Sequence, residues 1–229
     1  MRALSIVAFL FILITLNGQN TWSVEVSSLH YISYRDLHNV PKMPWAVFPR
    51  QKEIAAYRPG LGFSLLKQVS PKLQLKFGAR FADKGYNTHQ WDAFWGIEII
   101  DGKIYERRSK VQEIYHFSYL DIPIGLRYQP APDRKWSWYM DLSLMPGYYL
   151  GTHKIKHLDV ETKSRFRDES FRPFQLGLNA GVGISFRLND HLSLFAQPSI
   201  YYNITRLRNT GDKENLMGAG IEIGCRYRF

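Results

Sequence analysis

The sequence has almost no cysteine and comparatively few acidic residues. Cys225 is the single cysteine among 229 residues, so an intramolecular disulfide and a cysteine-based zinc cluster are both excluded. The chain has 20 aspartate and glutamate residues and 30 lysine and arginine residues, which gives a formal net charge of +10. This excess favours an anionic neighbour, either nucleic acid or an anionic membrane surface. A glycine-rich phosphate loop, a zinc-ligand spacing and a nucleotide fingerprint are also missing, so we expect no metal and no cofactor.

Long apolar runs are missing except at the N-terminus, and the mean hydropathy of −0.29 excludes a bundle of membrane helices. Arg2 precedes an apolar stretch from Ala3 to Leu16, and Gly18 is a small residue suited to the position before a cleavage site. Residues 1–18 therefore predict a secretory signal peptide cleaved near Gly18, with residues 19–229 as the mature domain. A membrane anchor is the alternative, but a spanning helix needs about 20 apolar residues. Export argues against a nucleic-acid partner.

The mature chain is dominated by strict alternation of apolar and polar residues. Residues 174–188 read FQLGLNAGVGISFRL, so that every even position is apolar and every odd position is polar or glycine. Alternation with period two predicts a β-strand with one apolar face, and this segment is longer than a typical soluble strand of about five or six residues. Eight segments share the pattern: about 22–35, 57–66, 73–84, 120–129, 136–151, 174–188, 192–204 and 217–229.

The connections between these segments alternate between long and short. The long ones are residues 36–56, 85–112, 152–173 and 206–215, and the short ones are residues 69–72, 129–135 and 189–191. This alternation predicts an all-β fold, an eight-stranded antiparallel up-and-down transmembrane β-barrel in the outer membrane, with long loops outside and tight turns in the periplasm. Closure would give every backbone polar group a partner in lipid. Aromatic residues, at 15% of the chain, gather near both ends of the predicted strands, as membrane girdles do.

Two segments resemble a known family. The stretch YLDIPIGLRY at residues 119–128 resembles a strand of the PorT-like outer-membrane β-barrels of Bacteroidetes, and residues 73–86, which contain the pair Lys84-Gly85, resemble the preceding strand. The last residues, with Tyr227 and Phe229, resemble the signal that the barrel-assembly machinery reads. The resemblance implies a cell-envelope protein, and some relatives are tied to secretion across the outer membrane. It assigns no functional residue.

The polar faces of the strands predict a cluster of charges inside the barrel. Its members are Glu25, Arg58, Lys76, Arg80, Asp121, Arg127, Asp141, Arg187, Glu222 and Arg226. An eight-stranded barrel is just wide enough to be filled by side chains, so we expect a packed network of ion pairs that closes the lumen. The alternative is a narrow path that prefers anions, because basic residues outnumber acidic ones.

Two long loops carry candidate binding residues. In the third loop, contacts to lipopolysaccharide phosphates are expected from Lys154, Lys156, Lys163, Arg165 and Arg167, with a solvated loop as the alternative. The spacing of His153 and His157 does not indicate a metal site.

In the second loop, Asp101-Gly102 predicts a hairpin turn. An exposed aromatic surface that binds a partner could be formed by Trp91, Phe94 and Trp95, but we expect these side chains to pack internally.

His116 and Ser118 support one enzymatic hypothesis. Lipid A deacylases on eight-stranded barrels place a His-x-Ser pair on the lipid-facing wall, and here both residues share the face of Leu120. No orienting carboxylate or oxyanion donor can be assigned, so we expect no catalytic residue and no enzyme. The sequence predicts a barrel that acts through extracellular loops in surface interaction or in envelope- and secretion-related assembly. A channel, a lipid-modifying hydrolase and a soluble exported barrel are the alternatives.

Overall fold

The computed structural model describes residues 22–38, 53–101, 103–157, 162–167, 169–209 and 213–229. The predicted signal peptide and its cleavage near Gly18 lie outside these ranges. Within them, no helix is long and apolar enough to cross a membrane. The strands are β1 (Trp22–His38), β2 (Glu53–Ile54), β3 (Ala56–Ser70), β4 (Leu73–Thr88), β5 (Trp91–Ile100), β6 (Lys103–Asp121), β7 (Ile124–Tyr128), β8 (Trp136–His157), β9 (Thr162–Phe166), β10 (Phe174–Arg187), β11 (Leu192–Asn203) and β12 (Lys213–Arg228).

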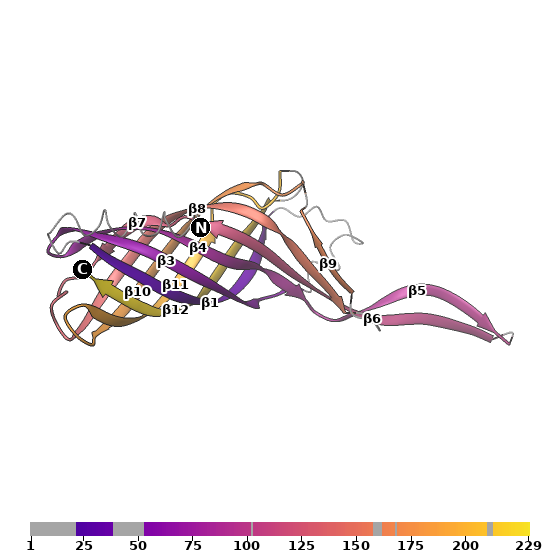
Figure 1. Ribbon diagram of the computed structural model, residues 1–229. Helices are drawn as coiled ribbons and strands as arrows, with labels where there is room; N and C mark the ends of the chain where they lie inside the picture. The colour runs from indigo at the N-terminus through magenta and orange to yellow at the C-terminus, as the bar shows by residue number, and fades with distance from the viewer. Residues whose placement is uncertain (1–21, 39–52, 102, 158–161, 168, 210–212) are drawn as a thin grey trace, which may run out of the picture.

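The antiparallel sheet closes on itself, as Figure 1 shows. Strand β1 pairs with β12, where Val26 lies opposite Cys225, and on its other side with β3. From β3 the ring continues to β4, then to β6 and β7, which follow one another at a single position, and then through β8, β10 and β11 back to β12. The expectation of an all-β antiparallel fold is confirmed.

A proline interrupts one position of the ring. β6 ends at Asp121 and β7 begins at Ile124, with Pro123 between them. Proline has no N–H to donate to the ladder. Its carbonyl oxygen still accepts a hydrogen bond from the amide of Gly78 at 3.0 Å, so β4 remains joined to this position across the break.

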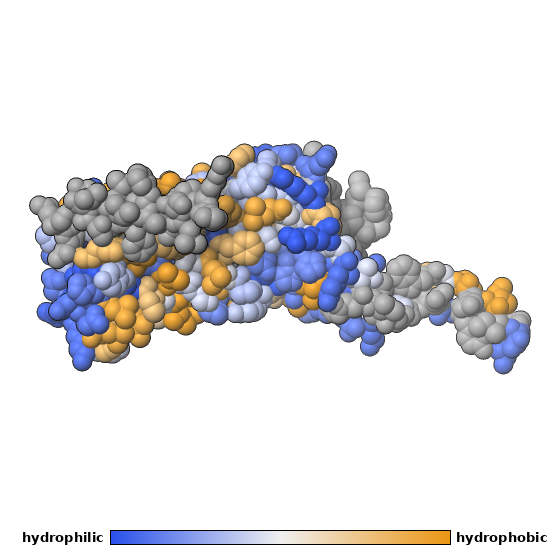
Figure 2. Space-filling model, in the orientation of Figure 1, coloured by the Kyte–Doolittle hydropathy of each residue, from blue (hydrophilic) through white to orange (hydrophobic). Residues whose placement is uncertain are grey.

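The two faces of the wall differ as the alternation predicts. Val182 and Ile184 on β10 expose 52% and 55% of their surface, whereas the intervening Gly183 and the following Ser185 are buried. Figure 2 shows apolar residues along the middle of the ring and polar residues towards its ends. The interior is polar and the exterior apolar, the reverse of a soluble domain.

Several strands run further than the apolar alternation indicates. β8 reaches His157 instead of ending near residue 151, and the predicted loop 85–112 is mostly strand, in β4, β5 and β6. Figure 1 shows the β5–β6 hairpin projecting far beyond the ring. Backbone hydrogen bonds between neighbours extend these strands beyond the segments in which one face is apolar.

Aromatic and aliphatic side chains close the end of the ring that carries the hairpin. The residues of this cluster are Tyr86, Phe117, Tyr119, Tyr149, Phe171, Leu207 and Leu216. Phe171 and Leu207 come from the connections that follow β9 and β11, and a β-bridge between Phe171 and Arg208 holds these connections together. We call this group the outer plug. The described connections 71–72, 129–135 and 188–191 lie at the opposite end, where the Phe229 amide donates to the Trp22 carbonyl oxygen at 3.2 Å.

Candidate functional site

A network of buried ion pairs crosses the middle of the lumen. Arg127 on β7 contacts both Glu25 on β1 and Asp141 on β8. Lys76 lies 2.8 Å from Asp141, and Arg226 lies 2.7 Å from Glu25. None of these residues is more than 3% exposed. Because the five side chains come from five strands around the ring, we call them the central network.

A second layer lies between the central network and the outer plug. The Arg80 guanidinium lies 2.8 Å from Glu222, which also accepts a hydrogen bond from the Tyr31 hydroxyl at 2.8 Å. Lys84 pairs with Asp121 at 2.9 Å. A cavity of about 20 Å³ beside these groups is large enough for about one water molecule. Each charge of these two layers therefore has an oppositely charged partner, as low-dielectric surroundings require.

The structure brings most of the predicted lumen charges together. Eight of the ten lie in the two layers: Glu25, Lys76, Arg80, Asp121, Arg127, Asp141, Glu222 and Arg226. Arg58 lies apart, near the outer end, and donates to Asn87 at 2.8 Å and to the Tyr115 carbonyl at 2.9 Å. Arg187 is at the turn end, 23% exposed and beside Asp133.

Sequence reasoning did not include three of the buried charges. Lys84 is in the second layer, and Arg35 pairs with Glu214 at 3.1 Å below the outer plug, with its guanidinium 4.1 Å from the centre of the Tyr86 ring. All three lie at or beyond the outer ends of the predicted strands. Arg35 and Lys84 already lie on the polar faces of the first and third predicted segments, as their last residues, and were left out of the predicted lumen cluster.

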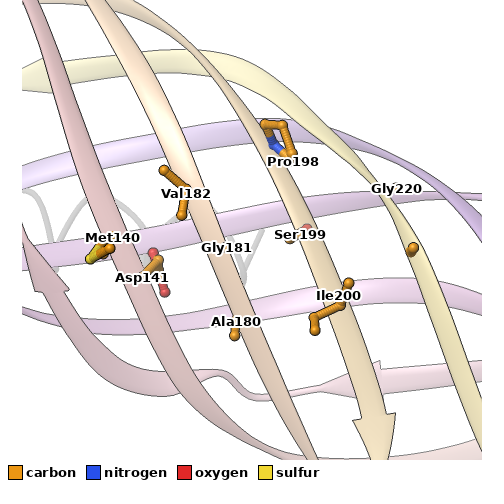
Figure 3. Close-up of a pocket in the computed structure, with 10 residues that line it drawn as sticks. Met140, Asp141, Ala180, Gly181, Val182, Pro198, Ser199, Ile200 and Gly220 are labelled. Carbon is orange, nitrogen blue, oxygen red and sulfur yellow. The ribbon is translucent and has the colours of Figure 1, made fainter.

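The exterior wall has a shallow apolar depression over β8, β10, β11 and β12, shown in Figure 3. Its volume is about 550 Å³, and its lining includes Met140, Val182, Pro198 and Ile200 around the small residues Ala180 and Gly181. The pairing of β10 with β11 skips the neighbourhood of Pro198, between Gly181 and Ile184. Asp141 is the only charged residue of the lining, and it is bound in the central network. Apart from Asp141 and Ser199, the lining consists of apolar residues and glycine.

The candidate hydrolase residues lie on the exterior face near the outer end. His116 Nδ1 is 2.6 Å from the Asp83 carboxylate, an orienting group that sequence reasoning did not identify. Ser118 lies opposite Asp83 in the pairing of β4 with β6. Among the described contacts none joins Ser118 to His116. Asp83 therefore holds His116 through Nδ1, as an orienting carboxylate does.

The five residues predicted to contact phosphate lie on two different faces of the sheet, at the end that carries the β5–β6 hairpin. Lys154 Nζ lies 2.8 Å from Glu113, above the ring of Tyr115, on the inner face, and Lys156 shares that face of β8. Arg165 and Lys163 lie on the exterior face of β9, opposite His153 and Ile155, and Arg167 follows on the same side. No group of three metal-ligating side chains occurs among the described residues, and the side chain of His157 is outside them.

The division has a local cause. Between Ser118 and Tyr119 the pairing of β6 with β8 shifts, so that Leu150 is an extra residue on β8. A bulge of this kind reverses which alternate residues face inward. Beyond it, Lys154 turns inside although Tyr148 before it, also an even position, faces outside.

The β5–β6 hairpin exposes apolar side chains on its projecting part. Phe94, Ile97, Ile99 and Ile104 are 59%, 62%, 71% and 70% exposed. Ile99 lies opposite Ile104, and Ile97 is on the same face, two residues before Ile99. The expectation of internal packing was wrong for Phe94, because no other layer covers a two-stranded hairpin. The side chain of Trp95 lies outside the described residues.

Comparison with solved structures gives distant likenesses. Neisserial surface protein A is 12% identical with a TM-score of 0.42, over 91% of this chain and 97% of that chain. Ail, the attachment invasion locus protein of Yersinia pestis, is 10% identical with a TM-score of 0.43, over 92% and 100%. OprG from Pseudomonas aeruginosa is 10% identical with a TM-score of 0.46, over 92% and 97%. No curated protein matches the chain.

The sequence also matches a protein family along most of its length. Residues 32–209 match the family described as outer membrane protein beta-barrel domain. This range begins within β1 and ends after β11, so it contains most of the closed ring. The chain therefore belongs to the outer membrane protein beta-barrel domain family, and this membership supports a location in the outer membrane.

Proposed function

We propose that the chain is an eight-stranded transmembrane β-barrel without enzymatic activity that acts at the cell surface through its β5–β6 hairpin. The observation that carries this proposal is the exposure of Phe94, Ile97, Ile99 and Ile104 on a projection beyond the ring. The proposal includes export by the N-terminal signal, assembly through Tyr227 and Phe229, and kinship with PorT-like barrels, which rests on residues 73–86 and 119–128.

The hairpin has the properties of a surface that another protein covers. Isolated two-stranded hairpins are at best marginally stable in water, and exposed apolar groups mark interaction sites. Among the described strands, the part from Lys103 to Lys110 pairs with β5 alone, and no described strand pairs with the other edge of β5. Such edges bind an extended segment of a partner by strand addition, while the Ile97, Ile99 and Ile104 face supplies apolar contact.

The filled lumen favours this role over transport. A passing ion would meet the outer plug, then the Arg80–Glu222 and Lys84–Asp121 pairs, then the central network. Opening a path requires breaking several buried pairs together, and separating one buried pair already costs about 3–5 kcal/mol. The anion-channel alternative therefore needs a second conformation.

Site-specific photo-crosslinking in intact cells tests the proposal. A photoreactive residue at Ile99 should yield a discrete protein adduct, whereas the same residue at Lys72, in the exposed turn at the opposite end, should not yield that adduct. Ile104→Lys should abolish the adduct, because it places a charge opposite position 99 without touching the ring. Identical adducts with and without Ile104→Lys would refute a role for this face.

The hydrolase alternative has its own test. The Asp83–His116 contact is the observation in its favour. The proposal expects lipid A from cells that express Ser118→Ala to match wild type in acyl-chain content by mass spectrometry. If lipid A loses an acyl chain in cells that express the wild-type protein but not in cells that express Ser118→Ala, the protein is an enzyme and the proposed role is wrong.

A further inference from the structure

The exterior face of β9 carries a line of three cations that runs along the strand. Lys163 and Arg165 alternate with inward positions on β9, and Arg167 follows at the same spacing. All three are exposed. We call them the β9 strip. Adjacent alternate residues on a strand are about 7 Å apart, so the strip extends over about 14 Å.

Arg167 places the strip relative to the apolar wall. Its Nη2 donates to the Tyr148 hydroxyl at 2.6 Å, and its guanidinium lies 5.4 Å from the centre of that ring. Tyr148 packs against Phe174, at 5.1 Å between ring centres, and Phe174 is 71% exposed on the exterior face. These two rings end the apolar band, as an aromatic girdle does at a membrane interface. The strip therefore begins at the girdle and runs outward, through the level at which lipid headgroups lie.

The Arg165 side chain is available to bind an anion. It lies opposite His153 in the pairing of β8 with β9, and no hydrogen bond or ion pair engages its guanidinium among the described contacts. Asp83 on the exterior face is bound to His116, and β6 and β8 separate it from β9. By contrast, the two inward lysines predicted for the same role have Glu113 on their face.

We propose that the β9 strip binds phosphate groups on the headgroups of lipids in the outer leaflet. Guanidinium groups bind phosphate oxygens through paired charge-assisted hydrogen bonds, and two arginines on one face can hold a phosphate between them or two neighbouring phosphates. The contact with Tyr148 fixes one guanidinium beside lipid instead of in free solution. The inference rests on the membrane orientation in the proposed function, but not on the hairpin or its partner.

A lipid-binding titration tests the inference. The mature chain is folded in neutral detergent micelles and titrated with bisphosphorylated lipid A, and the bound lipid is counted by native mass spectrometry. Arg165→Ala with Arg167→Ala should weaken binding about tenfold or more, the change expected from losing one charged hydrogen bond. The matched control is Lys72→Ala with Arg134→Ala, which removes the same charge from exposed turns at the opposite end. Heat-dependent gel mobility confirms that each variant is folded.

Three comparisons decide the outcome. Dephosphorylated lipid A should bind no better to wild type than to the β9 strip variant, and inorganic phosphate should compete only weakly, since it lacks the acyl chains. Equal binding of lipid A by the strip variant and wild type overturns the inference. Binding of heparin that depends on the strip, without preference for lipid A over its dephosphorylated form, also overturns it and assigns the strip to an anionic polysaccharide. Failure of hairpin crosslinking would leave this result unaffected.

Discussion

Lys84 and Asp121 form a buried ion pair across β4 and β6, with 2.9 Å between Nζ and the nearer carboxylate oxygen. The Lys84 ammonium also lies 4.7 Å from the centre of the Tyr119 ring. The two partners belong to the two segments that resemble PorT-like barrels, so the residues that carry this resemblance meet inside the lumen. Neither charge is more than 4% exposed.

Removing one partner should destabilise the barrel. Lys84→Met leaves Asp121 charged, buried and unpaired, so we expect the free energy of unfolding to fall by about 3–5 kcal/mol. Urea titration in lipid vesicles, followed by gel mobility without boiling, measures it. Lys72→Met, in an exposed turn, should change stability by less than about 0.5 kcal/mol. A loss no greater than that of the control would mean that water reaches Asp121.

A glycine on the neighbouring strand should be coupled to the same carboxylate. A β-carbon at Gly147 would overlap with Asp121 Oδ1. Gly147→Ala should therefore cost about 1–3 kcal/mol, the range for overpacking a filled interior. In an Asp121→Ala background the added cost of Gly147→Ala should be smaller by at least about 0.5 kcal/mol, which a double-mutant cycle measures. Strict additivity would contradict the contact.

The two faces of β10 should respond oppositely to charge. Ile184 points outward, and arginine on a lipid face near the midplane costs about 2–4 kcal/mol. Ile184→Arg should destabilise the folded barrel, whereas Ile184→Leu should not. Spin labels on cysteines placed at positions 182, 184 and 186 should report hydrocarbon, and labels at 183 and 185 should not. Accessibility in the opposite phase would invalidate the assigned faces.

The lumen should not conduct ions, even without the outer plug. Phe171→Ala with Leu207→Ala removes two plug side chains but leaves the central network intact. In planar lipid bilayers, neither wild type nor this variant should give discrete conductance steps. Anion-selective steps from the wild-type protein would restore the channel alternative.

The last residue should matter for assembly more than for the finished fold. The Phe229 ring packs edge-on against Tyr227, 5.2 Å between centres, at the turn end. Deleting Phe229 should lower the amount of folded barrel in cells while precursor export continues, as measured by gel mobility of the membrane fraction. An unchanged folded yield would show that Phe229 is only an interface anchor.

The sequence by itself determined the orientation of most side chains. Alternation along residues 174–188 predicted which residues face outside, and the exposures of Val182 and Ile184 agree with it. This is a local property, because every strand places successive side chains on opposite faces whatever its partners are. The order of long and short connections likewise indicated antiparallel neighbours.

Only the tertiary structure decided which side chains meet. Arg127 reaches Glu25 because β7 and β1 lie across a closed ring, and Asp83 reaches His116 because β4 is in register with β6. The extra residue Leu150 turned Lys154 inward and left Arg165 outside. Register, closure and bulges depend on pairing between segments distant in the chain, and alternation within one segment carries no information about them.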